Sequence, residues 1–444
     1  MNRRQALKAA MTAALAAPLA LNPLSQAVAA TPAAPAAQPS GTSRRYNSSV
    51  YPVSMSLYCF NQNINSWIKG RSGKSAPPIT TVDAITWAKN AGCDQVDITS
   101  YFIPGYDTHT MPTRPADEIT AFAADLRTHC DNIGIGVSGT GVFNDFADPD
   151  DSRRELDVQR TKFWTDIAAV LGAPGIRVFS GVVPDDLDTA GGWEGVTRSR
   201  IVPALREVTA YAAAKGVEVT LQNHGDMTAT AEQTLQMLDW VGDANLSIMD
   251  DTGYFRPFQA PTGDDYDWYH DIMKVLPRSS SIQVKRKPAG AESDGPMMDY
   301  QRLFTGLRLS DYRGYLPCER LWDKDAADNP KNQPTPPFEQ IASFLDEVKA
   351  GLASSQADPF SALATAITRE GQSGGFANGS WRSLANMADQ AGQEFARNQP
   401  AAMNAHLANL QRGLASEQNI TPATAQTLQA QLDALLLPVA DVFG

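Results

Sequence analysis

Short apolar segments and segments of helical periodicity alternate along most of this chain. The apolar segments begin roughly 30 to 45 residues apart. They occupy residues 53–60, 95–99, 134–138, 175–179, 217–222, 246–250, 282–285 and 315–318. Strands that alternate with helices form parallel sheets, because each helix carries the chain back to the starting edge of the sheet. Eight such units within about 300 residues favour a closed (β/α)8 barrel, a TIM barrel, over an open doubly wound sheet.

The segments between the strands support this interpretation. Residues 81–90, 198–215 and 231–240 carry apolar side chains at the i, i+3, i+4 spacing of an amphipathic helix. Gly92 and Gly216 follow two of them, at the position where a helix commonly ends in a left-handed residue. The sequence therefore predicts helices that end just before a buried strand begins.

The first 29 residues are typical of an export signal. Arg3, Arg4 and Lys8 precede an Ala/Leu-rich stretch at 9–21, and a small-x-small cleavage site ends at Ala29. The apolar stretch is too short to span a bilayer. Its start, MNRRQALK, resembles the twin-arginine signal of bacteria, while an ordinary secretory signal with adjacent arginines is the alternative. We expect cleavage near Ala29 and a soluble protein that is periplasmic or otherwise exported.

Charge and cysteine content exclude several classes of protein. The formal net charge is −12, which argues against nucleic acid or anionic membranes as partners. No later segment is apolar enough to predict a membrane span. The four cysteines lack CxxC spacing, so a zinc ribbon is not expected, and their pairing stays open.

Changes in composition divide the chain into four expected parts. They are a signal peptide at 1–29, a Pro/Ala-rich linker at 30–48, the barrel at 49–353 and a helical C-terminal domain at 357–444. The last part is rich in Ala, Gln, Asn and Leu, and helices are predicted at 401–417 and 422–437. Its pattern resembles small helical bundles appended to extracellular polysaccharide-active enzymes. We expect it to pack on the barrel, to tether the protein or to bind a partner protein.

Polar residues cluster at the predicted ends of the last four strands. In a barrel of this kind, side chains at the C-terminal strand ends face one shared cavity, where polar groups serve chemistry rather than stability. Four segments meet there, and they read VTLQNHGD from residue 219, LSIMDDTGYF from 246, SIQVKRKP from 281 and YLPCERLWDKD from 315. The candidate catalytic groups in them are Glu319, Asp251, His224 and Lys285, with Asp250 as a further assistant.

In their order and spacing these segments resemble the xylose isomerase-like barrel superfamily of sugar isomerases, epimerases and type IV endonucleases. The resemblance covers residues 53–350. The family pattern is E-N-H-G after strand five, D-T-G-H after strand six, H-x-K-D after strand seven and a glutamate after strand eight. It implies a divalent metal at four positions, which in this chain are Gln222, Asp251, Gln283 and Glu319.

Two of these four positions are glutamines, which changes the chemistry that the resemblance implies. An amide oxygen can bind Mn²⁺, Mg²⁺ or Ca²⁺ but is a weak ligand for Zn²⁺, so either a weak oxygen site or no metal is expected. The resemblance also makes the first and last glutamates paired bases of an epimerase. Gln222 cannot accept a proton at neutral pH, which favours one-sided chemistry such as β-elimination, hydration or glycosidic cleavage.

Further side chains are candidates for contact with substrate. Aromatic rings at the strand ends can stack on sugar rings, and amides can bind hydroxyl groups. The predicted substrate-binding residues are Gln222, Asn223, Gln283, Tyr254, Trp322, Asp97 and Asn144. Purely structural roles are the alternative: Asp251 could cap a helix, and Glu319 could pair with Arg320 or Lys324 on the surface.

The sequence therefore predicts an exported enzyme of isomerase, epimerase or lyase type. Its expected substrate is a small sugar or keto-sugar or an oligosaccharide, because phosphorylated sugars are scarce outside the cytoplasm. A non-catalytic sugar-binding protein with a degenerate metal site is the competing hypothesis, and a polysaccharide hydrolase or lyase is a third. An endonuclease is disfavoured by the acidic charge and by the missing metal-binding histidines.

Overall fold

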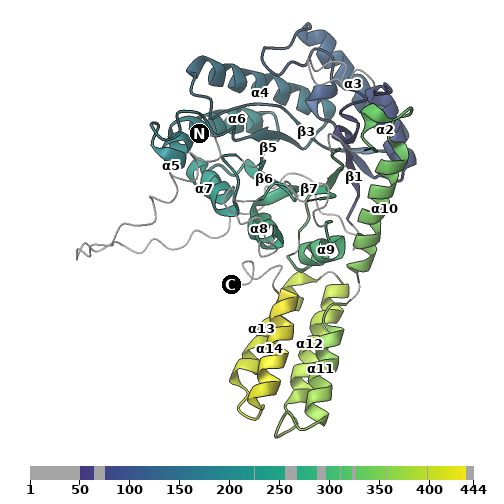
Figure 1. Ribbon diagram of the computed structural model, residues 1–444, viewed down its shortest axis with the longest axis vertical. Helices are drawn as coiled ribbons and strands as arrows, with labels where there is room; N and C mark the ends of the chain where they lie inside the picture. The colour runs from purple at the N-terminus through teal and green to yellow at the C-terminus, as the bar shows by residue number, and fades with distance from the viewer. Residues whose placement is uncertain are drawn as a thin grey trace, which may run out of the picture.

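A computed structural model describes residues 51–64, 76–224, 226–255, 268–287, 297–310, 312–322, 327–356, 358–397 and 399–436. The predicted signal peptide and linker lie outside these residues. Within them, eight parallel strands close into a barrel in sequence order (Figure 1). The strands are β1 (Ser54–Ser56), β2 (Gln95–Asp97), β3 (Gly136–Gly141), β4 (Gly175–Phe179), β5 (Glu218–Gln222), β6 (Leu246–Asp251), β7 (Ser279–Lys285) and β8 (Pro317–Glu319). The predicted TIM barrel is confirmed.

Helices cover the outside of the barrel, as a parallel sheet requires. They are α2 (Thr81–Asn90), α3 (Ala116–Ile133), α4 (Asp151–Leu171), α5 (Gly192–Val196), α6 (Val202–Ala214), α7 (Ala231–Val241), α8 (Trp268–Val275), α9 (Tyr300–Leu309) and α10 (Phe338–Ser354). Thr80 and Thr230 each form a capping box at the start of α2 and α7. Among the described residues, no helix combines the length and hydrophobicity needed to cross a membrane.

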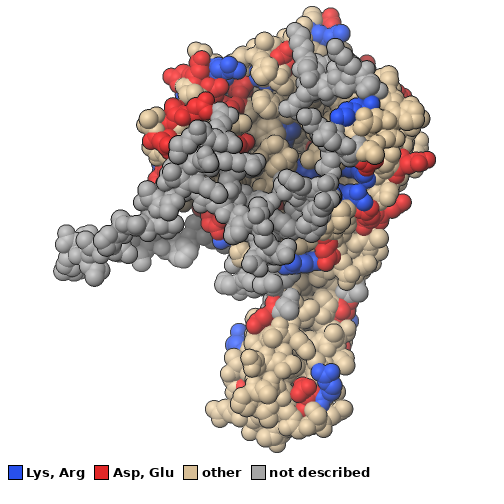
Figure 2. Space-filling view, in the orientation of Figure 1, with Lys and Arg blue, Asp and Glu red and all other residues tan. Residues whose placement is uncertain are grey.

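The predicted helical C-terminal region is confirmed as a bundle that projects from the barrel beside α9 (Figure 1). It contains α11 (Ser361–Gln372), α12 (Trp381–Ala396), α13 (Pro400–Ser416) and α14 (Pro422–Leu436). Arg308 of α9 joins the two parts, because its guanidinium lies 4.9 Å from the ring centre of Phe395 on α12. Figure 2 shows few charged side chains on the visible face of the bundle, in keeping with its Ala- and Gln-rich sequence.

Several predicted boundaries differ from the observed ones by a few residues, and two of the differences have a clear local reason. The predicted strand at 53–60 ends at Ser56, because the Ser56 hydroxyl accepts a hydrogen bond from the Tyr58 N–H and starts a 3₁₀ turn (Leu57–Phe60). The predicted helix at 198–215 begins with a wide π turn (Thr197–Ile201) before α6. Pro203 lacks an N–H for the regular helical bond at this point.

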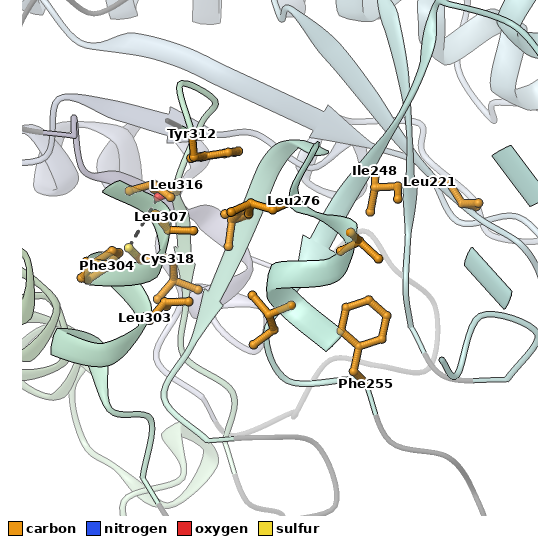
Figure 3. Packing of buried hydrophobic residues seen from close by; sticks show 14 of the residues in the cluster. Leu221, Ile248, Phe255, Leu276, Leu303, Phe304, Leu307, Tyr312, Leu316 and Cys318 are labelled. Atoms are coloured by element: carbon orange, nitrogen blue, oxygen red, sulfur yellow. Dashed lines mark hydrogen bonds between the residues drawn. The ribbon is translucent and has the colours of Figure 1, made fainter. Parts of the chain in front are cut away.

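Side-chain alternation along the strands separates the apolar core from the polar interior of the barrel. On β7, Ile282 and Val284 belong to the hydrophobic core, whereas Gln283 and Lys285 turn inward. Figure 3 shows α9 side chains, including Leu303 and Leu307, close to Cys318 of β8 in the same core. The last inward-facing residue of each strand therefore lies at one end of the barrel.

Candidate active site at the ends of strands β5 to β8

The last inward-facing residues of four neighbouring strands form one buried polar cluster. β5 contributes Gln222, β6 contributes Asp251, β7 contributes Gln283 and Lys285, and β8 contributes Glu319. Each of these residues is at most 6% exposed. The sequence placed all five residues at strand ends, and the structure brings them into direct contact. We call this group the polar ring.

Hydrogen bonds connect the two amides of the polar ring to its two carboxylates. Gln222 Nε2 donates to Asp251 Oδ2 at 2.5 Å and to Gln283 Oε1 at 2.8 Å. Gln283 Nε2 donates to Glu319 Oε2, also at 2.5 Å. The amides therefore form a bridge that supplies each carboxylate with an N–H donor.

Lys285 closes the ring from the other side. Its ammonium lies 3.2 Å from Asp251 Oδ2 and donates a hydrogen bond to Glu319 Oε1. Burial alone would lower the pKa of Lys285, but the two carboxylates raise it above its ordinary value, so the side chain is charged. Burial raises the pKa of Asp251 to about 6, against the lowering effect of the ammonium.

Backbone and side-chain contacts hold the ring in place. Asn223 binds the backbone of Asp251 twice, with its Oδ1 accepting from the Asp251 N–H at 2.6 Å and its Nδ2 donating to the carbonyl at 3.0 Å. The Gly253 N–H donates to Asp251 Oδ1 at 2.9 Å. Ser56 of β1 donates to Glu319 Oε2 at 3.4 Å. Asn223 thus positions Asp251, and Ser56 is a member of the site that sequence reasoning missed.

Asp250 lies on the opposite side of β6 and does not join the ring. Among the described residues neither of its carboxyl oxygens has a hydrogen-bond partner. Burial, reinforced by the charges of Asp251 and of Asp271 on α8, raises the pKa of Asp250 well above its ordinary value. Its expected assistance to the catalytic groups is not supported, since alternation turns neighbouring side chains to opposite faces.

Aromatic rings lie beside the polar ring. The Tyr254 ring centre is 5.3 Å from Lys285 Nζ, and the exposed His224 stacks on Tyr254 with ring centres 4.1 Å apart. The ring centre of Phe179 on β4 is 4.7 Å from the ring centre of His224. His224 therefore stacks on Tyr254, and Tyr254 in turn lies beside Lys285. The sequence had predicted His224 among the acid–base groups themselves.

A second buried cluster lies on β2 and β4. Arg177 donates to the Val142 carbonyl at 2.6 Å and to the Tyr101 hydroxyl at 3.3 Å. Asp97 is 5% exposed, and among the described residues its Oδ2 has no hydrogen-bond partner. Burial raises the pKa of Asp97 to about 6 although Arg177 lowers it, while the charge of Glu319 adds to the rise.

Two other predicted substrate-binding residues have structural partners. Asn144 binds Phe179 twice through its amide, donating to the carbonyl at 2.7 Å and accepting from the N–H at 2.8 Å. Trp322 donates from its indole nitrogen to the Cys59 carbonyl at 2.9 Å, and Arg320 lies over its ring. Glu319 bonds to Lys285 within the ring, while Arg320 pairs with Asp328, so the expected surface pair of Glu319 with Arg320 is wrong.

The four positions at which the resemblance implies a metal do not fit a divalent cation. Within the described ranges, no group of three or more His, Cys, Asp or Glu side chains could hold a metal ion. The two carboxylates already face an ammonium, and the amide nitrogens point at the carboxylates. A divalent ion needs several oxygen ligands directed at one point, which this arrangement does not provide.

Comparison with known proteins agrees with the barrel. Residues 85–348 match the model of the xylose isomerase-like TIM barrel family, and residues 360–437 match that of the FIMAH domain. A putative xylose isomerase from Rhodospirillum rubrum is 15% identical with a TM-score of 0.53, over 68% of this chain and 99% of that one. An L-ribulose 3-epimerase is 16% identical with a TM-score of 0.50, and the match covers 69% of this chain and 95% of the epimerase. The chain matches no curated protein sequence.

Proposed function

Since the chain belongs to the xylose isomerase-like TIM barrel family, we propose that it is an enzyme of isomerase, epimerase or lyase type that acts on a sugar or keto-sugar. One observation carries the proposal: a charged lysine lies between two buried carboxylates at the end of the barrel where such folds place their active sites. Structures of a putative xylose isomerase and of a ribulose epimerase share this fold.

The arrangement suits removal of a proton from a carbon next to a carbonyl group. Glu319 is the base that takes the proton, and the C–H electron pair then moves to the carbonyl oxygen as an enolate. Lys285 stabilises that negative charge: an ammonium has three donors, two of which Asp251 and Glu319 accept. The third is directed to the substrate oxygen.

Asp251 accepts a hydrogen bond from Lys285 and keeps the lysine charged. Glu319 holds the proton that it removed and is the group that returns it to the enolate. Return to carbon gives an isomer or an epimer, whereas loss of a leaving group from the next carbon gives an elimination product. Gln222, which replaces the partner base that the resemblance implies, favours the one-sided outcome.

Tyr254 and His224 form the wall against which the substrate binds. Their stacked rings present an aromatic face next to Lys285. Sugar rings pack their C–H faces on such surfaces while their hydroxyl groups bind polar side chains. The histidine assists as a donor or acceptor at the edge of this wall.

The proposal is tested by incubating the purified protein with a panel of keto-sugars and oligosaccharides and analysing the products. We expect an isomer or an elimination product from at least one keto-sugar, and loss of turnover with retained sugar affinity in Glu319→Gln. Glu347→Gln is the matched control, since Glu347 pairs with Arg286 away from the polar ring. Sugar binding without any product would replace the enzyme hypothesis with that of a binding protein.

The protein is further proposed to be exported in the folded state by the twin-arginine route. The four cysteines, Cys59, Cys93, Cys130 and Cys318, are all buried and unpaired. Such thiols stay reduced if the chain folds before it meets an oxidising compartment. Replacing Arg3 and Arg4 by lysines should leave the protein in the cytoplasm, as measured by fractionation, and unchanged export would contradict this route.

A further inference from the structure

The geometry points to Lys285 as the resident cation of this site, in place of the divalent metal that the resemblance implies. We infer that the protein binds no metal at the polar ring while Lys285 is present. This inference concerns what the site holds, so it stands or falls separately from the reaction proposed above.

The hydrogen-bond chain turns the nitrogens of both amides, rather than their oxygens, toward the carboxylates. Asp251 and Glu319 lie at its two ends, and each carboxylate needs an N–H donor. Gln222 gives one to Asp251 and Gln283 gives one to Glu319, while Gln283 Oε1 accepts from Gln222. Turning either amide over would place its oxygen against a carboxylate oxygen, which is repulsive unless a metal ion lies between the two oxygens.

The site is built around the lysine side chain. A Cβ at residue 253 would lie 2.8 Å from Lys285 Cγ, so the glycine there makes room for the lysine stem. The Lys285 N–H donates to Thr252 Oγ1 at 2.9 Å, and Tyr300 donates its hydroxyl hydrogen to the Lys285 carbonyl at 3.1 Å. The backbone of Lys285 is therefore fixed on both sides, and its ammonium is directed between the carboxylates.

Charge balance supports the same conclusion. Asp251 and Glu319 are both at most 6% exposed, and two neighbouring buried carboxylates require a compensating cation. The Lys285 ammonium, 3.2 Å from Asp251 and bonded to Glu319, supplies it from within the chain. A divalent ion would have to displace this ammonium. Because Lys285 is only 3% exposed, the displaced ammonium would remain among buried side chains.

The test is a titration with Mn²⁺, with bound ion measured by equilibrium dialysis and the melting temperature measured in parallel. The wild type should show no saturable binding and no change of melting temperature with Mn²⁺ or a chelator. Lys285→Met keeps the length of the side chain without its charge. It should melt roughly 10 °C lower and should take up a single equivalent of Mn²⁺, which raises its melting temperature again.

Controls separate this result from general effects on folding. Lys287→Met removes a half-buried lysine outside the polar ring and should behave as the wild type does. If Lys285→Met does not fold, Lys285→Gln serves instead, because it also removes the ammonium while both carboxylates remain, and it should bind Mn²⁺. Saturable binding by the wild type that is lost in Asp251→Asn would overturn the inference. So would a folded Lys285→Met protein that binds no metal.

Discussion

Asp97 is predicted to lower the stability of the protein at neutral pH. The side chain lies at the end of β2, and its carboxyl group is almost completely buried. Oδ1 accepts only a long hydrogen bond, 3.5 Å from Thr99 Oγ1, and among the described residues Oδ2 accepts none. Ionisation of this group in the folded protein is therefore unfavourable.

The magnitude follows from the pKa of Asp97, which burial raises to about 6 from 3.8. The folded state holds the proton more tightly than the unfolded state does, so this stabilisation is fully present below about pH 4. It is lost as the pH rises through 6. A difference of about 2 pKa units corresponds to about 3 kcal/mol. Asp97→Asn, which cannot ionise, should be more stable than the wild type by up to this amount at pH 8 and nearly equal to it at pH 4.

The assay is denaturant unfolding of wild type and Asp97→Asn at several pH values between 4 and 8. Asp125→Asn, which changes an exposed carboxylate on α3, should follow the wild type at every pH. A gap between wild type and Asp97→Asn that does not grow with pH would refute the reasoning. Arg177 would then hold the Asp97 carboxylate ionised in the folded state. A stabilising substitution at this position would indicate that the acid is kept for function.

Two further substitutions test the packing of the polar ring. Gln283→Leu removes the donor to Glu319 and the acceptor of Gln222, so the free energy of unfolding should fall by about 2 to 4 kcal/mol in a denaturant titration. A fall below about 0.5 kcal/mol would show that water replaces the amide. Gly253→Ala places a Cβ 2.8 Å from Lys285 Cγ and should cost about 1 to 3 kcal/mol, whereas an unchanged melting temperature would show that the lysine is mobile.

The barrel could be predicted because its sequence pattern is governed by burial. Parallel strands covered by helices must be apolar on the helix side, and the helices between them must be amphipathic. Strand ends were less predictable, because they depend on single hydrogen bonds. Ser56, for example, ends β1 by binding the backbone of Tyr58, and no periodicity in the sequence indicates that bond.

The candidate site was predictable in position and less so in its connections. Strand ends in a barrel converge, and this placed Gln222, Asp251, Gln283 and Glu319 together. The partner of each polar group depends on rotamers and on neighbouring strands. For this reason the sequence did not show that Lys285 joins both carboxylates. In the sequence, the two glutamines indicated a metal site that had lost two of its ligands. In the structure they form a hydrogen-bonded bridge between the carboxylates.

The step proposed for the polar ring is removal of a proton from a carbon next to a carbonyl group. Deuterium incorporation measures this step without knowledge of the final product. The protein is incubated in D₂O with the keto-sugar that raises its melting temperature most, and exchange at that carbon is followed by mass spectrometry. The wild type and Glu347→Gln should catalyse exchange, and folded Glu319→Gln should lose it by roughly 100-fold or more. Equal exchange in Glu319→Gln, or tight sugar binding by the wild type without exchange, would contradict the account.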